Sequence, residues 1–235
     1  MGLIDVHCHL LYGVDDGAKT MEDSIAMLDS AAAEGVSDIV LTPHYRHGMF
    51  AYPGEVIRKH FLQLQPEAAR RNLRLYLGCE YHVNSRIIEY LETKRTLPLA
   101  DSEYVLTEYE YEVEASYIME QSVLLLNHGY IPIIAHVERY RCFHEDFELA
   151  RLLRRQGALI QINADAVLGM DGMRTKGFCK KMLRDGLADI VASDSHDLKN
   201  RCNHLGVCYA YISKHYGQQM ADCLLRHNPG QILGL

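Results

Sequence analysis

Candidate metal ligands recur just past the ends of the apolar strands that this sequence predicts. The first apolar run ends in His7 and His9, whose alternate spacing projects both imidazoles from one side of a strand end. Six of the seven predicted strands carry at least one such residue. The candidates are His7, His9, Asp16, His44, Glu80, Glu108, His136, Asp194 and His196. A single histidine after a strand is more often a hydrogen-bonded loop residue, but repetition on six strands predicts one shared metal site.

The alternation of strands with helices predicts an α/β fold with a parallel sheet. Helices are expected at 20–34, 54–70, 85–93, 115–128, 145–156, 174–185 and 204–227, and a further short one at Asn228-Pro229. Gly35 follows the first helix as a stop signal, and Gly217 is expected to break the long final one. Seven strands favour a distorted (β/α)7 barrel with its candidate ligands gathered at the C-terminal rim of the strands, where such barrels carry their active sites.

Length and composition agree with one barrel domain spanning residues 1–235. The chain is 48% hydrophobic and 23% charged, enough to bury one substantial core. It has no apolar stretch of 18 residues and no export signal before its first strand, so we expect a soluble cytoplasmic protein without membrane insertion. A net charge of −7 disfavours nucleic-acid binding, and seven scattered cysteines are expected to be reduced thiols.

The candidate ligands also indicate a type of chemistry. Imidazoles mixed with carboxylates suit Mn, Fe or Zn better than Mg alone, and nine candidates exceed what one ion needs. Two or three clustered ions can activate water and brace a displacement at phosphorus. Arg46, Arg139 and Arg201 follow candidate ligands closely, which favours a phosphate-binding role over three solvated loop residues.

Several segments resemble a known family over nearly the whole chain. They are Asp5-Val6-His7-Cys8-His9, Val14-Asp15-Asp16-Gly17, Thr42-Pro43-His44-Tyr45-Arg46, Gly78-Cys79-Glu80, His136-Val137-Glu138-Arg139-Tyr140 and Ser193-Asp194-Ser195-His196. Together they resemble the polymerase and histidinol phosphatase (PHP) superfamily. More narrowly, they are similar to its bacterial manganese-dependent protein-tyrosine phosphatases of capsule and exopolysaccharide loci.

This resemblance implies a trinuclear site of divalent ions, with Mn as the first choice and Fe, Zn or Mg as alternatives. One ion would be held by His7, His9, Glu80 and Asp194, a second by Glu80, Glu108 and His136, and a third by Asp16, His44 and His196. The implied reaction is metal-assisted hydrolysis of phosphotyrosine, with Arg139 and Arg201 stabilising charge on the phosphoryl oxygens. The implied substrate is the tyrosine-rich tail of a bacterial tyrosine kinase that regulates polysaccharide export.

Two other functions fit the same residues. A small-molecule phosphoesterase, such as a histidinol-phosphate phosphatase, would use the same metals, and a regulatory module would keep them only to dock a kinase. A thiol-based phosphatase is excluded, because no cysteine has an arginine six positions later. Helical faces such as Ile25, Leu28 and Ala32 fit either a core or a homo-oligomer interface.

Residues next to the ligands receive supporting roles. We expect Asp15 and Glu138 to hold ligands or loops rather than to bind metal. Asn163 ends the only predicted strand without a ligand and is expected to complete the rim by hydrogen bonding. Among the aromatic residues, Tyr45, Phe50 and Tyr140 are candidates to line a pocket for a phosphotyrosine ring.

Overall fold

The computed structural model describes residues 2–235, and strands alternate with helices along them. The strands are β1 (Leu3–Cys8), β2 (Val36–Leu41), β3 (His44–Arg46), β4 (Phe50–Ala51), β5 (Arg74–Leu77), β6 (Glu80–His82), β7 (Tyr104–Glu108), β8 (Ile131–Ile134), β9 (Leu159–Asn163) and β10 (Ile190–Ala192). The α-helices are α1 (Met21–Ala33), α2 (Gly54–Ala69), α3 (Ile87–Glu92), α4 (Ala115–Asn127), α5 (Arg141–Glu145), α6 (Glu148–Gln156), α7 (Ala164–Leu168), α8 (Met173–Arg184), α9 (Leu205–Tyr216), α10 (Gln218–Asp222) and α11 (Asn228–Ile232). Two 3₁₀ turns, η1 (Leu99–Asp101) and η2 (Val137–Arg139), and one π-helical turn, η3 (Cys223–His227), complete the set.

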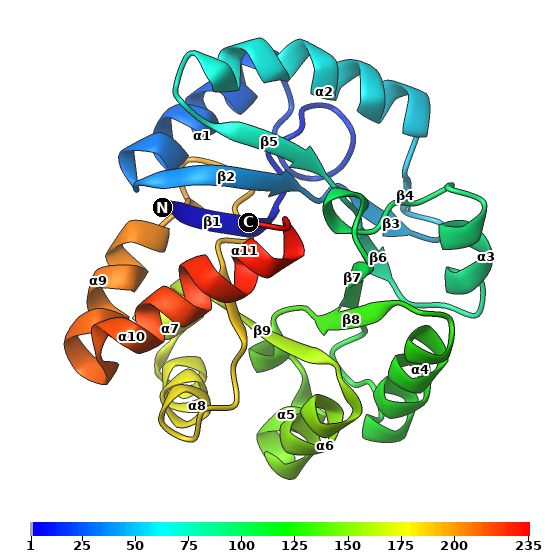
Figure 1. The fold of residues 1–235 in the computed structure, drawn as a ribbon, viewed down its shortest axis with the longest axis vertical. Coiled ribbons are helices and arrows are strands. Elements are labelled where there is room, and N and C mark those ends of the chain that lie inside the picture. Colours follow the sequence, from blue (N-terminus) through cyan, green and yellow to red (C-terminus); the bar gives the residue numbers. More distant parts are fainter. Residues whose placement is uncertain (1) are drawn as a thin grey trace.

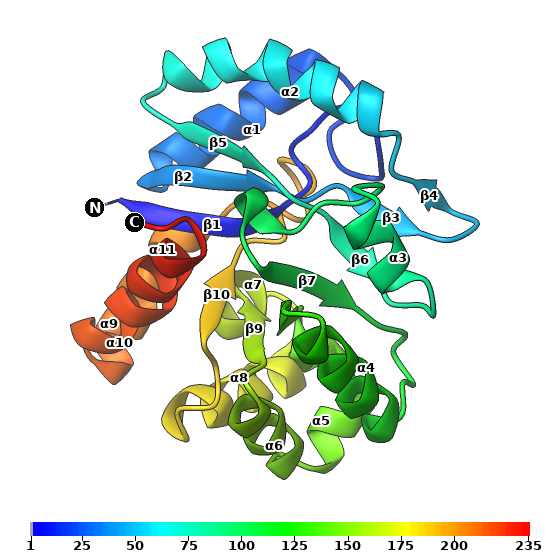
Figure 2. The same cartoon turned by 45° about the vertical axis from the view of Figure 1, so that its right-hand side comes forward.

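The strands form two sheets. One has the order β1-β2-β5, and the other has the order β10-β9-β8-β7-β6-β3-β4. All pairs are parallel except the β3–β4 hairpin, which the sequence did not predict. Figures 1 and 2 show the helices around the outside of the strands. The parallel α/β architecture expected from the sequence is therefore confirmed.

Two of the predicted strands are each broken into two pieces. Thr42-Pro43 separates β2 from β3, and proline has no N–H to donate to a strand ladder. Gly78-Cys79 separates β5 from β6, and a Cβ on Gly78 would lie 2.6 Å from Cδ2 of Leu99. Single backbone hydrogen bonds bridge the gaps, including Gly78 N to Leu41 O at 2.9 Å. The prediction of strands that end at His44 and Glu80 is therefore wrong, because these residues begin the second pieces, β3 and β6.

The first and last strands lie side by side, one from each sheet. Cys8 and Ser195 form a parallel β-bridge, and the Asp194 N–H donates to the His7 carbonyl at 2.8 Å. Buried Asp5 strengthens the seam between β1 and the segment that follows β10. It accepts hydrogen bonds from Oγ of Ser193 at 2.6 Å and from Nδ2 of Asn203 at 2.9 Å. The seam brings residues from both ends of the chain together.

Strands of both sheets share one buried apolar cluster, separate from the larger core beneath the helices. Its fully buried members are Ile4, Val6, Val40, Leu99, Leu106, Ile133, Ala135, Ile190, Ala192 and Ile232. The last of these comes from α11, which crosses beside β1 in Figure 1. The two sheets thus face a common interior.

Most predicted helices are present with small boundary changes. Thr20 and Asp23 form a capping box at α1, as the sequence predicted, and Gly217 separates α9 from α10. Leu28 is fully buried in the core, and Ile25 and Ala32 pack against the core. This face of α1 therefore packs inside the protein. Five-residue helices α5 and α7 were missed, because they are too short to show a helical period. None of the helices within residues 2–235 has the length and apolar character needed to cross a membrane.

Candidate metal centre

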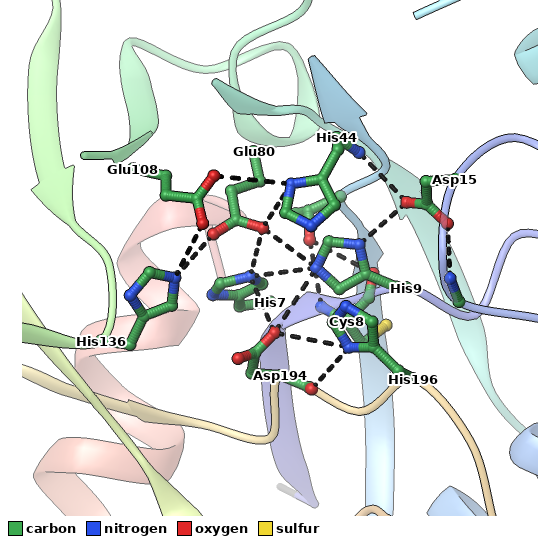
Figure 3. Close-up of polar contacts among 12 residues, drawn as sticks. His7, Cys8, His9, Asp15, His44, Glu80, Glu108, His136, Asp194 and His196 are labelled. Atoms are coloured by element: carbon green, nitrogen blue, oxygen red, sulfur yellow. Dashed lines mark hydrogen bonds and ion pairs between the residues drawn. The ribbon is translucent and has the colours of Figure 1, made fainter. Parts of the chain in front are cut away.

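The nine candidate ligands converge at the end of the strands, as Figure 3 shows for eight of them. His7 and His9 come from the end of β1, where the pairing register with β2 shifts between Asp5 and Cys8. Such a bulge re-aims side chains, and it lies directly before the histidine pair. Cys8 points elsewhere, with its thiol 3.6 Å from the Val40 carbonyl oxygen, as strand alternation predicted.

The first ligand group contains His7, His9, Glu80 and Asp194, all buried. Oε2 of Glu80 lies 3.0 Å from Nε2 of His7 and 3.1 Å from Nε2 of His9. Oδ1 of Asp194 lies 3.4 and 3.5 Å from the same two nitrogens. Four ligand atoms therefore surround one point, in the grouping expected from the sequence.

The second group contains Glu80, Glu108 and His44, whereas the sequence predicted His136 in place of His44. Nδ1 of His44 lies 3.1 Å from Glu80 and 3.8 Å from Glu108. His136, which was expected here, lies 2.8 Å from Oε1 of Glu80 and 3.9 Å from Oε1 of Glu108. Both imidazoles thus flank this carboxylate pair.

The third group joins Asp16 and His196 to His44 and His9. Oδ1 of Asp16 lies 3.4 Å from Nε2 of His196 and 3.5 Å from Nε2 of His44. His44 therefore presents its two ring nitrogens to two neighbouring groups. The expected set of Asp16, His44 and His196 is brought together.

Several of these ligand atoms are buried without a hydrogen-bond partner among residues 2–235. They are Nδ1 of His44, Oε2 of Glu80, Oε2 of Glu108, Oδ1 of Asp194 and Nε2 of His196. Buried polar atoms are normally satisfied, so five unsatisfied atoms in one cluster need a common partner. Carboxylate oxygens and imidazole nitrogens together fit divalent cations such as Mn, Fe or Zn. The residues present therefore fit a metal centre.

The charge states also suit metal binding. Burial opposes ionisation of Glu80, but the imidazoles around it hold its carboxyl pKa well below the usual range. Burial lowers the pKa of His44 to about 4 and that of His136 to about 4, so both rings are neutral at pH 7. Burial and the charge of Glu80 raise the pKa of Glu108 to about 8. A cation beside these two carboxylates would relieve their repulsion.

Three of the histidines are oriented by a partner on Nδ1. Nδ1 of His9 lies 2.9 Å from Oδ2 of Asp15, which confirms the supporting position expected for Asp15. Nδ1 of His196 lies 2.9 Å from the Asp194 carbonyl oxygen. Nδ1 of His7 lies 2.9 Å from Oε1 of Gln161. Each arrangement makes Nδ1 the donor and leaves Nε2 free as a ligand.

Gln161 was missed in the sequence, although one signal was available. It lies two residues before Asn163 on β9, the same spacing that marked the first histidine pair. Nε2 of Gln161 donates to Oδ1 of Asn163 at 2.7 Å, and Nδ2 of Asn163 donates to Oδ2 of Asp194 at 2.9 Å. Asn163 thus completes the rim by hydrogen bonding, as predicted. Glu138 accepts the Asn163 N–H at 3.1 Å and belongs to none of the three groups.

The three candidate arginines separate into two positions. Arg139 and Arg201 each donate to Oδ2 of Asp194 at 2.7 Å, while Oδ1 of the same carboxylate faces the histidines. Arg46 instead pairs with exposed Glu110 at 2.6 Å. Two of the three arginines are therefore in contact with the candidate ligands, and the third lies at the edge.

Two candidate ligands have left-handed backbone conformations. His136 has φ +34° and Asp194 has φ +52°, although neither is a glycine. Such conformations cost about 1–3 kcal/mol each and concentrate at functional sites. Asp194 is held by the hydrogen bond between its N–H and His7 across the seam.

Of the three aromatic residues expected to line a pocket for a phosphotyrosine ring, Tyr140 lines the cavity that adjoins His136 and Arg139, whereas Tyr45 and Phe50 do not. Tyr45 is buried against Tyr81, with ring centroids 4.8 Å apart, so it packs in the core. Tyr140 is also buried, and its hydroxyl lies 3.3 Å from Nδ1 of His136. Phe50 stacks on the His44 ring, with ring centroids 5.2 Å apart. Only Phe50 remains half-exposed.

Comparisons with known proteins identify the family of this chain. Residues 3–234 match the family model described as capsular polysaccharide synthesis, CpsB/CapC. The tyrosine-protein phosphatase YwqE of Bacillus subtilis is 31% identical over 96% of this chain and 92% of its own length. The tyrosine-protein phosphatase CpsB of Streptococcus pneumoniae is 34% identical, with 98% of each chain covered.

A solved structure is similar over nearly its whole length. It comes from work that describes YwqE from Bacillus subtilis and CpsB from Streptococcus pneumoniae as unique metal-dependent tyrosine phosphatases, and it superposes with a TM-score of 0.88 at 30% identity, covering 99% of this chain and 94% of that one. The family match covers residues 3–234, and this range contains every candidate ligand. The chain belongs to the CpsB/CapC family of capsular polysaccharide synthesis proteins.

Proposed function

We propose that this protein is a metal-dependent protein-tyrosine phosphatase. The observation that carries the proposal is the contact of two arginines with a carboxylate that also faces the first ligand group. Guanidinium groups at this position can bind a phosphoryl group held against the metal centre. The names of YwqE and CpsB support phosphotyrosine as the substrate.

The centre is proposed to hold three divalent ions at the rim of a distorted seven-stranded barrel within one domain, residues 1–235. Three overlapping ligand groups and the seam between β1 and β10 support this arrangement. The ligands are proposed to be His7, His9, Asp16, His44, Glu80, Glu108, His136, Asp194 and His196. Mixed nitrogen and oxygen ligands favour Mn, with Fe, Zn or Mg as alternatives.

When bound, the ions would lower the pKa of water and neutralise charge on the phosphoryl oxygens. The side chains of the site bind and orient the phosphoryl group. Arg139 and Arg201 bind the equatorial oxygens, whose charge they stabilise as the bond to the leaving oxygen breaks. Tyrosine has a pKa of about 10, so its phenolate leaves with less proton donation than an alkoxide needs. Arg46 lies at the edge, where it contributes to substrate binding.

A cavity of about 500 Å³ adjoins Glu108, His136 and Arg139. It is large enough for a phosphotyrosine side chain and part of its peptide. The partner is therefore proposed to be a tyrosine-phosphorylated protein, such as a bacterial tyrosine kinase of a polysaccharide locus, met in the cytoplasm. Nucleic acid is not an expected partner of an acidic chain with net charge −7.

The proposal is tested by phosphate release from a phosphotyrosyl peptide. Protein stripped of metal with a chelator should be inactive and should regain activity with Mn, and Arg139→Ala should lose most of it. Histidinol phosphate serves as the competing substrate. A folded, metal-loaded enzyme that hydrolyses histidinol phosphate but no phosphotyrosyl peptide would contradict the substrate assignment, and a protein that binds kinase without any turnover would support a docking module.

A further inference from the structure

The cavity beside the metal centre extends to residues that the proposed chemistry does not use. Its inner end is formed by Glu108, His136 and Arg139. Its outer wall is formed by Asp171, Arg174 and Thr175, from the α7–α8 loop and the start of α8. A phosphotyrosine at the inner end would place the neighbouring peptide residues along this outer wall.

Among the arginines that line the cavity, Arg174 forms no ion pair with a carboxylate of residues 2–235. The cavity's other arginines are paired, Arg46 with Glu110 and Arg139 with Asp194. Within residues 2–235, no carboxylate oxygen lies within 4.0 Å of the exposed Arg174 guanidinium. Most arginines of this chain do have such a partner, so Arg174 presents an uncompensated positive charge to whatever enters the cavity.

The position of Arg174 is unfavourable for the helix that carries it. It lies in the first turn of α8, which has no acidic residue. A positive charge there is destabilised by the helix dipole, typically by about 0.3–1 kcal/mol. Local helix stability therefore does not explain the arginine.

The same wall exposes apolar side chains. Tyr111, which lines the cavity, is 58% exposed, and Met170 and Met173, the sequence neighbours of Asp171 and Arg174, are 56% and 77% exposed. Gly169 and Gly172 have φ of +91° and +99°, so the loop turns sharply on both sides of Met170 and Asp171. Exposed methionine and tyrosine side chains are suited to contact varied peptides.

We propose that Arg174 determines substrate preference by pairing with an acidic side chain next to the phosphotyrosine, while Tyr111, which lines the same cavity, contacts the same peptide segment. This inference rests on the proposed phosphatase activity and adds the class of peptide. Asp171 on the same wall opposes the preference, because its carboxylate repels an acidic peptide.

The test compares phosphotyrosyl peptides that carry Glu, Gln or Lys on both sides of the phosphotyrosine. The ratio of kcat/KM between two peptides is measured within each metal-loaded variant, so a general change in activity cancels. We expect kcat/KM of the wild type to be about three- to fivefold higher for the Glu peptide than for the Gln peptide. This is the effect expected from one exposed ion pair. The ratio should approach one at high salt.

The variants make the assignment specific. Arg174→Gln should remove the preference, Arg174→Glu should reverse it toward the Lys peptide, and Asp171→Asn should increase it. Arg58→Glu is the matched control, since Arg58 is also exposed without a carboxylate within 4.0 Å but lies on α2, at the opposite side of the molecule from α8 (Figure 1).

The outcomes separate the two proposals. An unchanged Glu/Lys ratio in Arg174→Glu, with all peptides hydrolysed, would overturn the role of Arg174 and leave the phosphatase activity standing. Loss of the ratio in Arg58→Glu as well would also overturn it, because net charge alone would then explain the preference. Failure of the metal-loaded wild type to hydrolyse either p-nitrophenyl phosphate or any peptide would overturn both proposals.

Discussion

Nδ1 of His7, at the end of β1, donates to Oε1 of Gln161 on β9 over 2.9 Å. This hydrogen bond fixes the tautomer of a buried histidine and turns its Nε2 toward Glu80. The glutamine is therefore expected to act on the metal through the histidine.

Gln161→Leu should weaken Mn binding about 10- to 100-fold, because the imidazole loses its orienting acceptor. Metal titration of the stripped protein measures this directly. Gln121→Leu is the control, since Gln121 is also a buried glutamine but lies on α4, outside the hydrogen bonds of the site. Equal Mn affinity in both variants would show that Gln161 only fills space.

The arginines should differ in their effect on catalysis. Arg201→Ala should lower kcat/KM on the order of 10²–10³-fold, as for loss of one donor to a charged transition state. Arg46→Ala should lower it only a few-fold, because its guanidinium pairs with exposed Glu110. Both are measured at saturating Mn after the metal content has been checked. Equal losses would place Arg46 on the phosphoryl group.

Metal binding should release protons at pH 7. Burial alone would lower the pKa of His7 and His9, but nearby carboxylates raise both overall, and Glu108 has its pKa raised to about 8. These groups hold protons in the metal-free protein that an ion must displace, so apparent affinity should increase as the pH rises from about 6 to 8. Calorimetry in two buffers of different ionisation enthalpy measures the release. A flat affinity over this range would contradict it.

The seam between β1 and β10 should depend on Asp5. Asp5→Ala leaves the Ser193 hydroxyl and the Asn203 amide without their acceptor, so it should lower the free energy of unfolding by about 2–4 kcal/mol. Urea unfolding of the metal-free protein measures the change. Asp29→Ala is the control, because Asp29 pairs with Arg71 at the surface and should cost less. A similar loss in both would argue against the seam as a stability determinant.

The convergence of the candidate ligands could be predicted from the sequence because parallel strands all end on the same side. A histidine or carboxylate directly after an apolar run needs no tertiary information to be placed at that rim, as for His136 after β8 and Glu108 at the end of β7. The distances among the candidate ligands could not be predicted in the same way. His44 turns its two nitrogens to different groups, and a side-chain rotation of this kind leaves no sequence pattern.

The break at Thr42-Pro43 could have been predicted from the proline, but the break at Gly78-Cys79 could not be predicted from local pattern. A Cβ at position 78 would collide with Leu99, 21 residues later, so the need for a glycine there depends on a distant residue. Asp5 and Gln161 were overlooked for a related reason, since each is a polar residue inside an apolar strand. Their roles depend on partners far away in the sequence, Ser193 for one and His7 for the other.

The seam that joins β1 to the segment after β10 also sets when the centre can form during protein synthesis. His7 leaves the ribosome more than 180 residues before Asp194 and His196 do. A nascent chain therefore lacks a complete first or third ligand group until most of its helices have been made. Ion uptake at the proposed centre is consequently expected to be a late event in biogenesis, because a chain that ends before Asp194 carries only part of the proposed ligand set.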